Sequence, residues 1–116
     1  MLVEHDGGDR LNPLGRLPYR RIRVLGPSMA PTLKDGDVVL AKNREQPREG
    51  DVVVVTWVTR PRQLSIKRAR QANGNGWHVE GDNQDASTDS RDLGPAQVHG
   101  VVVARLWPHP RLLSSR

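Results

Sequence analysis

Two short runs of apolar residues dominate the hydrophobic pattern of this chain. Val38–Ala41 and Val52–Val58 are rich in β-branched side chains, and each run directly follows a Gly-Asp pair. Short β-branched runs bounded by turn residues are typical of buried strands, whereas amphipathic helices repeat their apolar positions about every 3.6 residues. We therefore expect two buried strands within the fold.

Alternating patterns predict further strands. Basic and apolar residues alternate over Arg21–Leu25, which runs into a Gly-Pro break. Over Gln63–Ala69, a two-residue alternation places Lys67 on the face opposite Leu64 and Ile66. Both segments are therefore expected to be strands, and Lys67 is expected to point away from the larger apolar side chains of its own strand.

The remaining turn and strand signals of the chain are also typical of a β protein. Asn73–Gly76 is a hairpin signal that returns through Trp77–Glu80, and Gly100–Trp107 is expected to form the last strand. Met29–Leu33 suffices for one helical turn, limited by Pro31, and no amphipathic stretch reaches ten residues. These features predict a mainly β, compact antiparallel fold.

A length of 116 residues limits the chain to one small domain. Residues 1–19 contain glycine and proline with little periodicity, and we expect them to form a flexible leader. The folded domain is expected over residues 20–108, followed by a basic C-terminal tail over residues 109–116.

Composition excludes several cofactors and partners. The chain has no cysteine, and its four histidines are far apart in sequence, so we expect no metal site and no cofactor. Lys and Arg exceed Asp and Glu by 18 − 13 = 5, yet aromatic residues are only 3% and the basic residues are scattered, so we expect no nucleic-acid partner. No stretch approaches the roughly 20 apolar residues of a membrane span, and no signal peptide is present. We expect a cytoplasmic protein, and a peripheral membrane contact stays open.

Candidate chemistry begins with Ser28, which follows a Gly-Pro pair, and with Lys67. A serine hydroxyl needs a base, and a lysine serves only if burial away from carboxylates lowers its pKa from about 10.4 toward about 7 to 8. No acidic residue adjoins Lys67. Each residue also has an ordinary interpretation, Ser28 as a helix N-cap and Lys67 as a solvated residue of an edge strand.

Four segments taken together resemble the signal peptidase I family of serine proteases, the S26 group. Gly26–Leu40 is similar to the nucleophile box of that family, Ser-Met-x-Pro-Thr-Leu followed by Gly-Asp and a strand. Gly50–Val54 resembles its next strand box, Ile66–Arg68 its base box and Gly81–Gly100 its last box. The boxes occur in family order and cover about residues 21–106.

The resemblance implies a serine endopeptidase with a Ser-Lys dyad and the fold of that family. Ser28 would be the nucleophile, with its backbone N–H donating to the oxyanion, and Lys67 would be the general base. Ser87 would orient the lysine amine through a hydrogen bond. Asp89 and Arg91 would pair to hold the last loop against the site, although alone they also fit a surface ion pair worth at most about 1 kcal/mol.

The chain departs from the family pattern in four respects. Gly26 stands where many members carry a serine that supplies a second oxyanion donor, and losing one donor costs about 10²-fold in turnover. We expect no transmembrane anchor of the family type, the insertion before the last box is reduced to the hairpin at Asn73–Gly76, and no Gly-Asp pair follows Lys67-Arg68. These features resemble the small soluble proteases that mature nickel-type superoxide dismutase. The implied partner is a precursor protein or its leader peptide.

Three alternative functions stay open. Signal peptidase-like processing of exported proteins uses the same chemistry. A LexA-like self-cleaving module shares the chemistry and a related β core, but it needs a cleavable upstream bond and normally a helix-turn-helix domain, and residues 1–19 indicate neither. A non-catalytic β module would bind a peptide or an acidic partner through its basic surface, but such a module has no need of a buried lysine.

Overall fold

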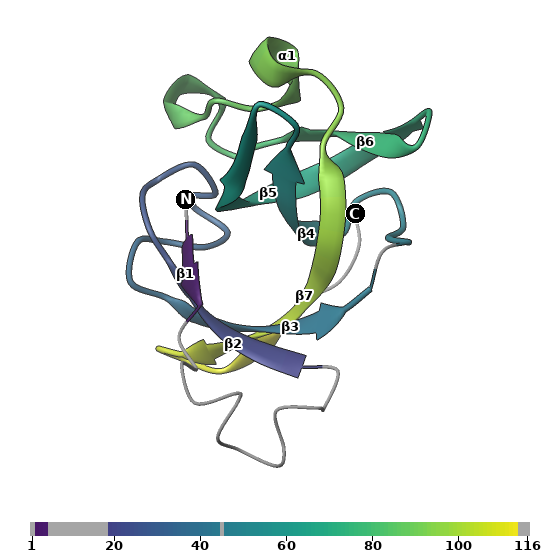
Figure 1. Cartoon of the computed structure of the whole chain (residues 1–116). Helices are drawn as coiled ribbons and strands as arrows, with labels where there is room; N and C mark the ends of the chain where they lie inside the picture. The colour runs from purple at the N-terminus through teal and green to yellow at the C-terminus, as the bar shows by residue number, and fades with distance from the viewer. Residues whose placement is uncertain (1, 5–18, 45, 114–116) are drawn as a thin grey trace.

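A computed structural model of the chain describes residues 2–4, 19–44 and 46–113 (Figure 1). Within these residues, no helix is long and apolar enough to cross a membrane. The described elements, in chain order, are β1 (Leu2–Glu4), β2 (Tyr19–Val24), β3 (Val38–Asn43), β4 (Val52–Trp57), β5 (Arg60–Asn73), β6 (Gly76–Glu80), a 3-10 helix (Gln84–Ala86), α1 (Ser90–Leu93), β7 (Gln97–Trp107) and β8 (Arg111–Leu112).

All strand pairs are antiparallel, and they form one sheet in the order β1-β2-β3-β7-β4-β5-β6, with β8 paired to β7. β7 joins two parts of this sheet, because residues 97–102 pair with β4 and residues 100–107 pair with β3. Figure 1 shows β7 running along the molecule from the part that holds β4, β5 and β6 to the part that holds β2 and β3. The expectation of a mainly β, compact antiparallel fold is confirmed.

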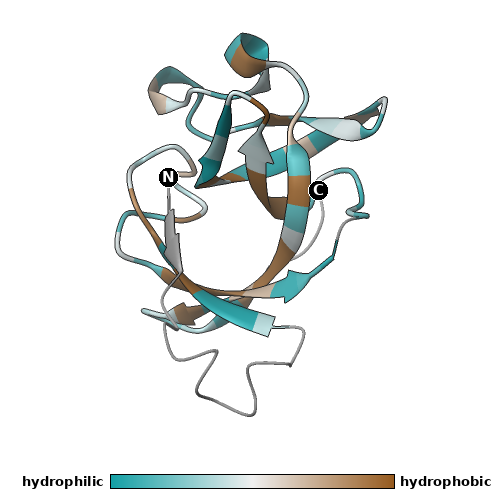
Figure 2. Cartoon of the chain, viewed as in Figure 1, coloured by the Kyte–Doolittle hydropathy of each residue, from teal (hydrophilic) through white to brown (hydrophobic). Residues whose placement is uncertain are grey.

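β4 is buried along its whole length and separates two hydrophobic cores. Val52 and Val54 face the first core, and Val53 and Val55 face the second, as the two-residue period of a strand requires. Figure 2 shows hydrophobic and hydrophilic bands along β7. The other buried members of the first core are Ile22, Val24, Met29, Leu33, Val39, Ala41, Ile66 and Val102, and those of the second are Trp57, Ala69, Val79, Ala96, Val98 and Val101.

The predicted strands are present, with different ends. β4 is the fully buried strand that its β-branched run predicts, whereas β3 completely buries only Val39 and Ala41. β5 extends beyond Gln63–Ala69 because it forms a hairpin with β4 at one end and with β6 at the other. Met29–Leu33 forms turns rather than a helix, with one helix-like hydrogen bond from the Leu33 N–H to the Met29 carbonyl at 3.0 Å.

Both ends of the described chain contribute strands that the sequence pattern did not predict. β1 pairs with β2 within the expected leader, and β8 pairs with β7 within the expected tail. Strands of two or three residues have no readable periodicity, because one period of a strand already takes two residues. Residues 5–18 and 114–116 lie outside the described residues, so the domain limits at 20 and 108 stay predictions.

Candidate active site

Ser28 lies in a tight turn shortly after β2. Its carbonyl oxygen accepts a hydrogen bond from the Asn83 N–H at 2.9 Å, and the Asn83 side chain donates to the Pro27 carbonyl at 3.1 Å. Ser28 is only 8% exposed, and no helix begins at it, so the N-cap interpretation is wrong. The turn is thus fastened to the segment that follows β6.

Gly26 has a structural reason to be glycine. Its φ is 87°, a backbone conformation that disfavours any residue with a Cβ, and its N–H donates to Asp35 at 2.8 Å. A serine at this position would therefore be strained. The departure from the nucleophile box follows from the path of the turn.

Lys67 is buried inside the protein, with 3% exposure, and pairs across the sheet with Val53 of β4. The interpretation of a solvated edge residue is therefore wrong. Its Nζ donates a hydrogen bond to Ser87 Oγ at 2.8 Å. Burial lowers the pKa of the Lys67 amine from 10.5; Asp89 raises this pKa, Arg91 lowers it, and the net shift is downward.

Ser87 connects the lysine to an ion pair between the buried Asp89 and the exposed Arg91. Its hydroxyl donates to Asp89 Oδ2 at 3.0 Å, and Arg91 Nε donates to Asp89 Oδ1 at 2.9 Å. The Gly81 N–H also donates to Asp89 at 3.1 Å. Burial raises the pKa of Asp89, but hydrogen bonds, chiefly from Arg91, outweigh it and lower the pKa to about 2. Asp89 is completely buried whereas Arg91 is exposed, so the pair joins the surface to the interior rather than lying wholly on the surface.

Ser28 and Lys67 line one cavity of about 360 Å³. Among the described residues, no hydrogen bond joins the Ser28 hydroxyl to Lys67 Nζ, which bonds to Ser87 instead. Such bonds are often long in unliganded active sites and tighten when a substrate binds. The other residues that line the cavity are Leu25, Gly26, Pro27, Trp57, Arg60, Gln63, Ser65, Ala86 and Thr88.

Sequence reasoning missed the close approach that Gly81 permits. A Cβ at this position would lie 2.5 Å from the Ser28 carbonyl oxygen and 2.6 Å from Ser87 Cβ. Only glycine lets the turn of Ser28 and the loop of Ser87 come this close. The sequence signal is the Gly-Asp pair at 81–82, which the family box includes without giving the reason for the glycine.

A second missed feature is the buried pair of Arg68 and Asp82. Arg68 Nη2 donates to Asp82 Oδ2 at 2.6 Å, and Arg68 Nε donates to Oδ1 at 3.1 Å. The Thr32 hydroxyl donates to the same carboxylate at 2.5 Å, and Arg68 Nη1 donates to the Gly50 carbonyl at 2.9 Å. This network ties the strand of Lys67 to the turn after Ser28.

Within residues 19–44 and 46–113, no three His, Asp or Glu side chains are grouped so as to hold a metal ion. The arrangement that the fold does build is a buried lysine amine, with lowered pKa, and a serine on the wall of the same cavity. A buried amine that titrates below its ordinary range is suited to accept a proton from a neighbouring hydroxyl.

The chain belongs to the Peptidase S24-like family, whose model matches residues 18–103. It is 32% identical to mitochondrial inner membrane protease subunit 1 of Xenopus tropicalis, over 72% of this chain and 66% of the frog protein. It is 31% identical to mitochondrial ATP-independent inner membrane protease subunit 1b of Arabidopsis thaliana, over 84% of this chain and 73% of the plant protein. It is also 31% identical to mitochondrial inner membrane protease subunit 1 of Schizosaccharomyces pombe, over 78% of this chain and 74% of the yeast protein.

These relationships confirm the resemblance to proteases of the signal peptidase type. The relatives are named as proteases of the mitochondrial inner membrane, which does not bear on a nickel-type superoxide dismutase precursor. The cytoplasmic location of this chain likewise stays a prediction.

Proposed function

We propose that the chain is a serine endopeptidase in which Ser28 is the nucleophile, Lys67 the general base and Ser87 the group that orients the base. The observation that carries the proposal is the Lys67 amine, buried, lowered in pKa and on the wall of the same cavity as Ser28. An ordinary structural lysine is solvated or paired with a carboxylate, whereas this amine donates to a neutral hydroxyl.

In the proposed reaction, neutral Lys67 takes the proton of the Ser28 hydroxyl as Oγ attacks the carbonyl carbon of the scissile bond. The Ser28 backbone N–H donates to the oxyanion of the tetrahedral intermediate. The lysine ammonium then protonates the leaving amine, the C–N bond breaks, and an ester remains on Ser28. Lys67 next deprotonates a water, which attacks the ester and releases the carboxyl product, and the ammonium returns a proton to Ser28.

Ser87 would orient the base through the direction of its own hydrogen bond. Because the Ser87 hydroxyl proton points to Asp89, its oxygen lone pair accepts an N–H of Lys67. The lone pair of the neutral amine is then free to face Ser28. Asp89 and Arg91 hold Ser87 in place, and their opposite effects on the Lys67 pKa partly cancel.

The proposed substrate is a precursor protein with a leader peptide, and the nickel-type superoxide dismutase precursor is the favoured example. That enzyme needs a free N-terminal amine as a nickel ligand, which cleavage at one bond exposes. The names of the relatives favour a second candidate, a precursor processed at a membrane. We place the protein in the cytoplasm for the first candidate and in peripheral contact with a membrane for the second.

The test is to incubate the purified chain with candidate precursors and to identify the products by mass. Ser28→Ala and Lys67→Ala should abolish cleavage, Ser87→Ala should slow it without abolishing it, and exposed-residue controls Thr59→Ala and Lys34→Ala should cleave normally. The rate should rise with pH through a limb below 10.5, because the Lys67 pKa is lowered from that value. Equal products from all variants would remove Ser28 and Lys67 from the mechanism.

A further inference from the structure

The short N-terminal strand β1 lies on the edge of the strand that leads to Ser28. β2 has β3 on one side and β1 on the other, with Leu2 opposite Val24 and Glu4 opposite Ile22. Figure 1 shows β1 alongside β2. The edge of β2 that would otherwise be open to an extended peptide is therefore filled by the chain itself.

β1 also approaches the strand that carries Lys67. Residues Ser65–Lys67 pair with β4 on one edge, and β6 pairs with β5 only from Arg68 onward. Among the described strands, the other edge of β5 before Arg68 has no hydrogen-bonded partner, and Cα atoms of β1 lie within 8 Å of Cα atoms of β5. β1 thus pairs with the outer edge of β2 and lies close to β5.

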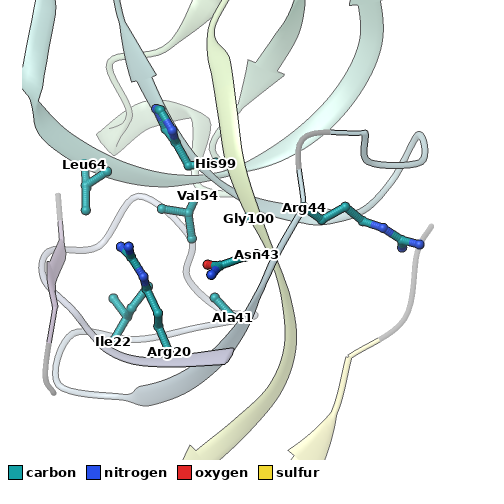
Figure 3. Close-up of a pocket in the computed structure, with 9 residues that line it drawn as sticks. All are labelled: Arg20, Ile22, Ala41, Asn43, Arg44, Val54, Leu64, His99 and Gly100. Atoms are coloured by element: carbon teal, nitrogen blue, oxygen red, sulfur yellow. The ribbon is translucent and has the colours of Figure 1, made fainter. Parts of the chain in front are cut away.

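β5 lines two cavities, and β2 lines one of them. The cavity of Ser28 and Lys67 is lined by Gln63 and Ser65 of β5. A second cavity, of about 530 Å³, is lined by Ile22 of β2, Val54 of β4 and Leu64 of β5, which gather around one space in Figure 3. Alternate residues of β5 therefore face alternate cavities, and an extended peptide beside β5 would send its own alternate side chains to both.

The direction of β1 makes it an obstacle rather than a substrate. β1 runs antiparallel to β2, and its residue nearest the site, Leu2, pairs with Val24, four residues before Ser28. No peptide bond between the described residues of β1 is therefore next to Ser28. The family match covers residues 18–103, so β1 lies outside the matched region.

We propose that β1 is a built-in competitor for the extended peptide that this site binds, and that a substrate must displace β1 from the edge of β2 and from its position close to β5. The proposal rests on the proposed peptidase function. A strand of three residues makes few hydrogen bonds, so it opens more easily than the rest of the sheet. β1 would slow the cleavage of weakly bound peptides. Peptides that pair along a longer stretch of the strand edge would displace it.

A disulfide can lock β1 in place, because the chain has no cysteine of its own. Val3 and Arg23 are cross-strand partners, and such pairs have Cβ atoms about 4.5 to 5.5 Å apart, near the range that a disulfide spans. We expect the oxidised Val3→Cys, Arg23→Cys protein to cleave a quenched fluorescent decapeptide library at least tenfold more slowly than the same protein after reduction. Each single cysteine variant should be insensitive to oxidation. Equal rates in the oxidised and reduced double variant would overturn the proposal.

A second measurement does not depend on cleavage. A Val3→Pro variant should weaken the β1–β2 pairing, because proline lacks an N–H and fits poorly within a strand. A labelled hexapeptide with the sequence of residues 1–6 should bind this variant at least tenfold more tightly than it binds the oxidised double cysteine variant. Equal binding to both refutes the competitor role, whereas absence of cleavage by every form, with this binding difference intact, refutes only the peptidase function.

Discussion

At the scale of single residues, the site depends on what surrounds one amine. Burial favours the neutral form of Lys67 and outweighs the charge of Asp89, which raises the Lys67 pKa but hydrogen-bonds to Ser87 rather than to the amine. Arg91 forms an ion pair with the Asp89 carboxylate. The lysine thus avoids the direct ion pair that would hold it protonated.

The stability contributed by Asp89 should depend on pH. Its pKa is lowered from 3.8 to about 2 in the folded state, so the unfolded state binds more protons between these values. The contribution, roughly 2 kcal/mol, is present above pH 4 and is lost as the pH falls toward 2. In urea unfolding, Asp89→Asn should therefore have a lower free energy of unfolding than the parent above pH 4. This difference in free energy should shrink as the pH falls from 4 toward 2. The exposed Asp85→Asn is the control and should have the same free energy of unfolding as the parent. A difference between Asp89→Asn and the parent that does not change with pH would contradict the lowered pKa of Asp89.

Residue identities were predictable here only with the family pattern. Only the family boxes single out Ser28, Lys67 and Ser87, because the local sequence of Ser28 also fits a helix N-cap and that of Lys67 also fits a solvated edge strand. Burial of Lys67 depends on β4, and its hydrogen bond depends on a residue 20 positions away. Neither is encoded in the neighbours of Lys67 along the chain.

At the scale of elements, segments distant in sequence are held together at one glycine. The turn of Ser28 and the loop of Ser87 both pack against Gly81, whose missing Cβ leaves them room. The Arg68–Asp82 pair adds a second tie between β5 and the same segment. Strand signals in the sequence located β5 and β6, but they could not show which loops meet beside them.

Gly81→Ala should disturb the site more than the fold. The added methyl would overlap the Ser28 carbonyl and Ser87, so at least one segment must shift. We expect a cleavage rate at least tenfold lower and an unfolding free energy lower by about 1 to 3 kcal/mol. Gly74→Ala is the matched control, because a Cβ there meets open space at a positive φ and should cost only about 1 kcal/mol with the rate unchanged. Equal cleavage by both variants would exclude Gly81 as a contact point.

At the scale of the whole molecule, β4 and β7 make the two cores one folding unit. β4 contributes alternate residues to both cores, and β7 pairs with strands of both parts of the sheet. Loss of one core would therefore expose one face of the strand that the other core needs. The domain should unfold in a single transition.

This coupling can be measured with tryptophan fluorescence. In a Trp107→Phe background, the remaining tryptophans, Trp57 and Trp77, both pack in the second core. Val39→Ala removes methyl groups from the first core, at a cost of roughly 2 kcal/mol. It should lower the urea midpoint seen by this fluorescence as much as the midpoint seen by far-UV circular dichroism. A fluorescence midpoint that stays in place would show that the cores unfold separately.

The sequence alone determined the longer strands, the hairpin and the class of fold, because the two-residue alternation and the turn residues act over a few positions and need no distant partner. The tertiary structure decided the state of Lys67, the contact at Gly81, the Arg68–Asp82 pair and the position of β1 beside β2 and close to β5. Desolvation, close packing and strand pairing each depend on residues that folding brings from elsewhere in the chain, so no local pattern records them.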